Sequence, residues 1–283
     1  MNFIAAIDDI STGTQTSSGW SYVLIDESLE AEFEEKTRAL LKGNALPKFH
    51  GKEYKKRFKQ SYIDFLKVIK EYAVNSDQSL LACVLLSQGW KENFVGFAER
   101  LGENPLKMNG INAVEVINPI KALTPSLFSM QNLTKEMGGE NSIKIKVDDH
   151  DNTRGFNQVI TKIKGFPFTG DKLLTMIYNG YRKQQFPQSP SLADSCIQVV
   201  KDEDSMLVQA VDIVANFSTA YIYGKLGKTS KTIKDKMEIF NEVFGDEFGN
   251  QDFFEGVELV NESDLKLKFE GQQTLQFGRY GSN

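Results

Sequence analysis

Cysteine and histidine are scarce in this chain of 283 residues, which has only two of each. Cys83 and Cys196 both lie in apolar runs, which predicts buried thiols in a reducing compartment and excludes a disulfide framework. No cysteines and histidines have the spacing of a zinc site. The G-x-S-x-G turn of many serine hydrolases is also missing. These absences direct attention to the acidic residues.

Long apolar runs and a strong net charge are missing as well. No run approaches the roughly 18 apolar residues of a membrane-spanning helix, so we expect no membrane partner. The N-terminus has no basic stretch of the kind that opens a signal peptide, and we expect a cytoplasmic location. The net charge of −5 excludes a surface that is basic throughout, although the 33 Lys and Arg residues could form a local basic groove.

The most apolar stretch of the chain, residues 207–223, predicts a helix that is buried on several sides. Asp212 lies in its middle, and neither Lys nor Arg is found one turn away. A buried carboxylate is costly unless it is paired, protonated or bound to a metal ion. Two explanations stay open, namely an ion pair with Lys or Arg of another element, or a metal ion.

Two predicted strands also end in neighbouring carboxylates. Residues 3–9 have apolar side chains on both faces, which predicts a central strand, and they end in Asp8 and Asp9. Residues 141–149 alternate between apolar and polar side chains and end in Asp148 and Asp149. Structural roles are the alternative explanation. The first pair would cap a hairpin turn, and the second would face the N-terminus of a following helix.

The rest of the chain predicts an alternation of strands and helices. Strands are expected at residues 20–25, 79–87 and 196–200, and helices at residues 27–41, 52–74 and up to about 244. Asp204 or Ser205 is expected to cap the buried helix. We expect strands within residues 253–269 and a frayed stretch over the last dozen residues.

A basic run opens the helix that is predicted at residues 52–74. Its cationic residues are Lys52, Lys55, Lys56 and Arg57. Such a run is usually a solvated face, but beside an acidic site it would bind phosphate groups. His50, just before it, is either structural or a ligand and proton carrier, and Glu53 is either a site acid or half of a surface ion pair.

Four short motifs, taken in this order, resemble a bacterial family known as "domain of unknown function 3800". They are IDDIS at residues 7–11, HGKE at 50–53, KVDDHD at 146–151, and DS at 204–205 followed by LVQAVDIVAN. The chain departs from the family pattern at four positions. Asp9 and Ile10 stand where the family tends to have Glu and then Ser-Gly, and Val211 stands where Ala is usual. Lys48 stands where a Glu is often found, so that Glu53 must take the acidic role.

The resemblance implies an α/β, ribonuclease-H-like fold with a mixed central β-sheet flanked by helices. This domain would cover residues 1–225, with a helical insertion at about 88–140 and a C-terminal helix and strand extension at 226–283. The family's site is built from the first strand, a middle strand and the last helix. By that likeness the site acids are Asp8, Glu53, Asp148 and Asp212, and Asp149 is the register alternative to Asp148.

Clustered carboxylates repel one another and coexist at neutral pH when a divalent cation neutralises them. Oxygen ligands suit Mg²⁺ or Mn²⁺, and a pair of such ions can promote phosphodiester hydrolysis. We therefore expect a metal-dependent nuclease that acts on RNA, DNA or a hybrid. Its expected metal ligands are Asp8, Asp148, Asp149 and Asp212, while His50 or Glu53 would orient the water or the leaving group.

A second hypothesis belongs to a different class. The same fold would serve as a non-catalytic nucleic-acid-binding or assembly module with protein partners, in a bacterial defence or mobile-element system that the family likeness suggests. A close carboxylate cluster with bound metal would favour the nuclease, and a site of only one or two facing acids would favour the module. A small-molecule phosphoesterase, which would have a closed pocket, is the third hypothesis.

Overall fold

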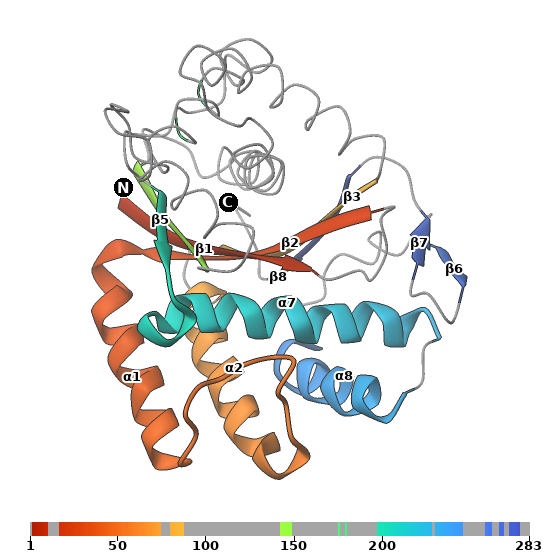
Figure 1. The fold of residues 1–283 in the computed structure, drawn as a ribbon, viewed down its shortest axis with the longest axis horizontal. Coiled ribbons are helices and arrows are strands. Elements are labelled where there is room, and N and C mark those ends of the chain that lie inside the picture. Colours follow the sequence, from red (N-terminus) through yellow and green to blue (C-terminus); the bar gives the residue numbers. More distant parts are fainter. Residues whose placement is uncertain are drawn as a thin grey trace, which may run out of the picture.

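The architecture is α/β and is described from a computed structural model. The described residues are 2–10, 17–74, 80–87, 142–148, 175, 179, 197–227, 230–245, 258–261, 266–268 and 272–277. A six-stranded mixed sheet runs through the molecule, and helices α1, α2, α7 and α8 lie on one of its faces (Figure 1).

The main sheet has the strand order β5-β4-β1-β2-β3-β8. Its strands are β1 (Asn2–Ile10), β2 (Ser17–Asp26), β3 (Leu80–Ser87), β4 (Ser142–Asp148), β5 (Ile197–Val200) and β8 (Gln272–Phe277). Strands β1, β2 and β3 form an antiparallel meander, whereas β4 is parallel to β1 and β5 is parallel to β4. A separate two-stranded sheet pairs β6 (Glu258–Asn261) with β7 (Lys266–Lys268).

Strand β1 has the central position that its sequence predicts. Ile4 and Ala6 belong to the core between the sheet and the helices, while Phe3, Ala5 and Ile7 are buried on the opposite face. Apolar side chains on both faces are typical of a strand that is covered on both sides. This alternation also places Asp8 on the helix-bearing face, two residues beyond Ala6.

Helix α7 (Met206–Lys225) confirms the predicted buried helix. It lies between the sheet and a layer formed by α1 (Glu30–Gly43), α2 (Lys59–Ala73) and α8 (Lys231–Phe244) (Figure 1). Because it has neighbours on both sides, apolar residues are favourable around most of its circumference. Each fully buried Val, Leu, Ile or Phe contributes about 1.5–3 kcal/mol.

The start of one helix and the structure of the last dozen residues differ from the predictions. The helix expected from residue 52 begins with the 3₁₀ turn η2 (Lys56–Phe58) and continues as α2 from Lys59, because the backbone of the preceding residues is bonded to side chains of other helices. The last dozen residues do not simply fray, since residues 272–277 form β8. This strand pairs with β3 and so covers an edge that would otherwise lack hydrogen-bond partners.

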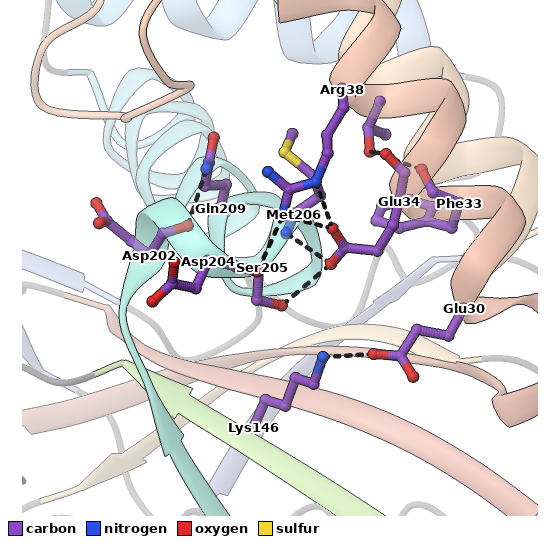
Figure 2. A network of polar contacts seen from close by, with 11 residues as sticks. Glu30, Phe33, Glu34, Arg38, Lys146, Asp202, Asp204, Ser205, Met206 and Gln209 are labelled. Atoms are coloured by element: carbon purple, nitrogen blue, oxygen red, sulfur yellow. Dashed lines mark hydrogen bonds and ion pairs between the residues drawn. The ribbon is translucent and has the colours of Figure 1, made fainter.

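Ser205 is the N-cap residue of α7, as one of the two predicted alternatives has it, but its side chain makes no capping hydrogen bond. Instead, Oε1 of Glu34 on α1 accepts hydrogen bonds from the backbone N–H of Met206 at 2.8 Å and from the Ser205 hydroxyl at 3.3 Å (Figure 2). A carboxylate is favourable there because the N-terminus of a helix is partially positive.

Helix α1 is also bonded to the sheet next to this cap. Lys146 on β4 forms an ion pair with Glu30 on α1 (Figure 2). Lys144 on the same strand forms an ion pair with Glu27 in the 3₁₀ turn η1 (Glu27–Leu29), just before α1. These pairs place the side chains of Lys144 and Lys146 on the helix-bearing face of the sheet. By alternation, Asp148 lies on the same face.

Candidate functional site

Asp212 contacts the segment between α1 and α2. Its Oδ2 accepts a hydrogen bond from the backbone N–H of Gly51 at 2.6 Å and lies 3.2 Å from Nδ1 of His50. Among the described residues, the partner from outside the helix is therefore the His-Gly pair of the HGKE motif, and no Lys or Arg of this part of the chain forms an ion pair with Asp212. Burial raises the pKa of Asp212 above its ordinary value of 3.8, although the Gly51 N–H, His50 and Lys52 oppose this shift.

Nδ1 of His50 faces two partners. It lies within hydrogen-bond distance of both Asp212 and the backbone N–H of Lys52, which is 3.3 Å away. An unprotonated Nδ1 accepts the hydrogen bond of Lys52, whereas a protonated Nδ1 donates to Asp212. Nδ1 is therefore the atom through which the imidazole of His50 meets both Asp212 and the backbone of the turn.

The turn that carries His50 is fixed by side chains from three helices. Gln209 on α7 accepts the N–H of Phe49 at 2.8 Å, and the hydroxyl of Tyr62 on α2 donates to the carbonyl of His50 at 3.0 Å. Lys236 on α8 donates to the carbonyl of Gly51 at 2.9 Å. A segment without regular backbone pairing thus has its polar groups satisfied, as buried backbone requires.

Asp8 and Asp148 lie on neighbouring parallel strands. The register pairs Ala6 with Lys146 and Ile7 with Val147, so the two aspartates follow one residue later at the same level. Both are half-buried and on the helix-bearing face, and adjacent strands lie about 4.8 Å apart. The sheet thus brings together the two acids that the sequence predicts from separate strands.

The structure brings no third predicted acid to this pair within the residues that it describes. Within the part of the chain that the structure describes, no three or more His, Cys, Asp or Glu side chains are grouped so that they could hold a metal ion. The polar contacts of Asp212 go to Gly51 and His50, and Glu53 is exposed on the turn. Asp149 and the insertion expected at about residues 88–140 lie outside the described residues.

An ion pair that the sequence analysis missed lies beside this turn. Nζ of Lys48 is 2.7 Å from Oδ2 of Asp202, which follows β5 in the 3₁₀ turn η3 (Asp202–Asp204). The hydrogen bond from Lys48 to Asp202 raises the pKa of Lys48, and the charges of Glu53 and Asp148 add to the effect. Lys48 thus links the turn electrostatically to the end of β4. Its only sequence signal was that it replaces a Glu of the family pattern.

The predicted phosphate-binding residues are all accessible. Lys52, Lys55, Lys56 and Arg57 are exposed and follow His50 within one stretch of chain. The guanidinium of Arg57 lies 4.7 Å from the ring centroid of Phe58, a favourable cation–π distance. A basic surface therefore borders the turn at His50.

No protein-family model matches the chain, and a search of the curated proteins finds no match either. In the described part of the chain, no helix has the length and apolar character needed to cross a membrane. The functional assignment therefore depends on the geometry of these residues.

Proposed function

We propose that this chain is a metal-dependent nuclease with a ribonuclease-H-like fold. The observation that carries the proposal is the placement of Asp8 and Asp148 at the same level of two parallel strands, on the face that α7 covers. In open α/β sheets ligands bind outside the carboxyl ends of the strands. Both aspartates lie toward these ends, since β1 ends at Ile10 and β4 at Asp148.

The order of the elements supports the ribonuclease-H-like assignment. The first strand is central, has an antiparallel hairpin partner on one side, and has the middle strand β4 in parallel on the other. Helix α7, which carries Asp212, packs against both strands. A first strand, a middle strand and a late helix are the three elements from which the family resemblance builds the site.

The donor set fits Mg²⁺ or Mn²⁺, because these ions prefer carboxylate oxygens and Asp8 and Asp148 supply them from neighbouring strands. Asp8 and Asp148 would hold the ions, with Asp149 as the alternative ligand on the same segment. The contacts of Asp212 with described residues use Oδ2, so Oδ1 is the oxygen that would bind an ion. When bound, the ions would supply an activated water and stabilise charge on the phosphate.

The turn and the basic run after it would supply the groups that transfer protons and bind phosphates. His50 would carry a proton to or from the reacting oxygen or orient the water with Glu53, and the basic run would hold the phosphates on either side. RNA, DNA and their hybrid are all candidate substrates. The buried free thiol of Cys83 supports the reducing, cytoplasmic setting that we propose for the chain.

The test is cleavage of labelled RNA, DNA and hybrid duplexes with Mn²⁺. Wild type is expected to cleave at least one of them, while Asp8→Asn and Asp148→Asn lower the rate by at least about 100-fold, since each removes a charged metal ligand. Asp64→Asn is the matched control, because Asp64 is bonded to Gln60 on the exposed side of α2. An inactive wild type, or an active Asp8→Asn variant, would contradict the proposal.

A non-catalytic nucleic-acid-binding or assembly module is the second candidate. It is favoured because no three acids are grouped together among the described residues. It is also favoured by the contacts of Asp212, which tie α7 to the turn as a structural aspartate would. This candidate predicts salt-sensitive binding of RNA or DNA without cleavage in Mn²⁺. It also predicts that Asp8→Asn binds nucleic acid with unchanged affinity.

A further inference from the structure

One residue of the HGKE motif, Gly51, is held at both its N–H and its carbonyl. The N–H of Gly51 donates to Asp212 on α7 at 2.6 Å, and its carbonyl accepts from Nζ of Lys236 on α8 at 2.9 Å. Lys236 also donates to Oδ1 of Asn216 on α7 at 2.5 Å. Two helices that are separate in sequence from the turn thus hold the same residue.

The fit around Gly51 is close. A Cβ at this position would lie 2.6 Å from Cγ of Asn216 and nearer still to its Cβ, so a larger residue would push the turn off α7. Asn216 is the same residue that accepts the hydrogen bond of Lys236. The turn, α7 and α8 therefore meet at one point without space between them.

A lysine is energetically costly at this buried position. Lys236 is only 8% exposed, and its Nζ lies 5.6 Å from the ring centroid of Phe217 and 6.0 Å from that of Tyr54. Burial lowers the pKa of Lys236, and the charge of Asp212 opposes that shift. A buried ammonium is costly, and an apolar residue of similar size would often be at least as stable. The hydrogen bonds it donates are what an apolar residue could not supply.

We propose that Lys236 is a positioning residue for the turn at residues 49–53. By holding the carbonyl of Gly51 it fixes the residue whose N–H meets Asp212, and so orients His50 and Lys52 on either side. The role of the turn in cleavage rests on the proposed nuclease function, whereas the clamp on Gly51 does not. Lys236 lies in the C-terminal extension, outside the four motifs.

Hydrogen exchange of backbone amides, followed by NMR, tests the clamp directly. In Lys236→Met, which removes the donor but keeps a long side chain, the amides of Phe49 and Gly51 are expected to exchange at least about 10-fold faster than in wild type. Amides in the middle of α7 are expected to keep their rates. Lys234→Met, an exposed position on the same helix, is the control and should change neither.

Unchanged exchange at Gly51, or equal acceleration throughout α7, would overturn the proposal. If Lys236→Met does not fold, Lys236→Gln is measured in its place. The Gln side chain keeps an N–H donor but is shorter, so the Gly51 amide of this variant should still exchange faster than in wild type. In an active enzyme Lys236→Met should lower kcat more than it raises KM, because the basic run stays in place. If wild type cleaves no substrate, the proposed nuclease function is rejected. The exchange rates still test whether Lys236 holds Gly51.

Discussion

Gly51 occupies a position that only glycine fits, because Asn216 lies against its Cα. Gly51→Ala is expected to lower the free energy of unfolding by about 1–3 kcal/mol, as overpacking does, and to displace His50 from Asp212. Gly43→Ala is the control, since no atom lies within 4 Å of a Cβ at that position. Urea unfolding of both variants measures the difference, and equal effects would contradict a clamped turn.

Cys83 is the centre of a buried polar chain in which its Sγ lies 3.0 Å from the hydroxyls of both Ser21 and Ser218. Burial raises the pKa of the Cys83 thiol from 9.0 to about 11. The folded state therefore keeps its proton to higher pH than the unfolded state does. The stability that this thiol contributes is complete below pH 9 and is lost as the pH rises toward 11.

The measurement is the free energy of unfolding of wild type and Cys83→Ala at several values between pH 8 and pH 11. Wild type is expected to lose roughly 2–3 kcal/mol more than the variant over this range, at about 1.4 kcal/mol per pKa unit. The two serines stay in place in the variant, so the difference isolates the thiol. If the free energies of unfolding of the two proteins changed in parallel with pH, the thiol would have the same pKa in the folded and unfolded states.

At the scale of elements, Glu34 joins α1 to the N-terminus of α7. Glu34→Ala removes the acceptor for Met206 N–H and the partner of Arg38, and should lower the free energy of unfolding by about 1–2 kcal/mol. Glu35→Ala, at the next and exposed position of α1, should change it by less than about 0.5 kcal/mol. Thermal unfolding of the pair gives the comparison, and similar losses would argue against a cap supplied by α1.

Local sequence patterns predicted the elements whose environment is uniform along their length. Strand β1 is buried on both faces and α7 on most sides, so their apolar residues were sufficient evidence. The start of α2 was predicted wrongly because contacts distant in sequence decide it. Ser205 was predicted as an N-cap residue of α7, but the acceptor for the Met206 N–H comes from Glu34 on another helix. Strand β8 was missed because Gln272 to Gln276 shows little apolar alternation, and its backbone pairing with β3 makes it a strand.

The candidate site also combines features that the sequence predicted with features that only the tertiary structure shows. The sequence indicated that Asp212 needs a partner from elsewhere, but only the tertiary structure shows that His50 and Gly51 contact it. The neighbouring positions of Asp8 and Asp148 depend on the register of β1 and β4, which a single sequence does not specify. No pattern in the sequence indicated a role for Lys236, because that role depends on how α8 packs against α7.

At the scale of the whole molecule, the proposed function requires a local basic surface, because an acidic chain with a net charge of −5 would repel nucleic acid elsewhere. Replacing Lys55, Lys56 and Arg57 by Gln should weaken binding to duplex DNA and reduce the salt slope by about 0.9 for each phosphate that these residues neutralise. The matched control replaces Lys42, Lys67 and Lys231, which are exposed on other elements. Fluorescence anisotropy at salt concentrations from about 50 to about 200 mM measures both slopes, and equal slopes would place the nucleic acid elsewhere.

The central claim, a metal site built on the paired strands, is tested most directly by calorimetric titration with Mn²⁺ of wild type, Asp8→Asn and Asp64→Asn. Asn is nearly isosteric with Asp but uncharged, so the folded sheet should be preserved. We predict that wild type and Asp64→Asn bind Mn²⁺ alike, while folded Asp8→Asn binds at least about 10-fold more weakly. Equal binding by all three proteins, or no binding by wild type even with a non-hydrolysable oligonucleotide present, would contradict it.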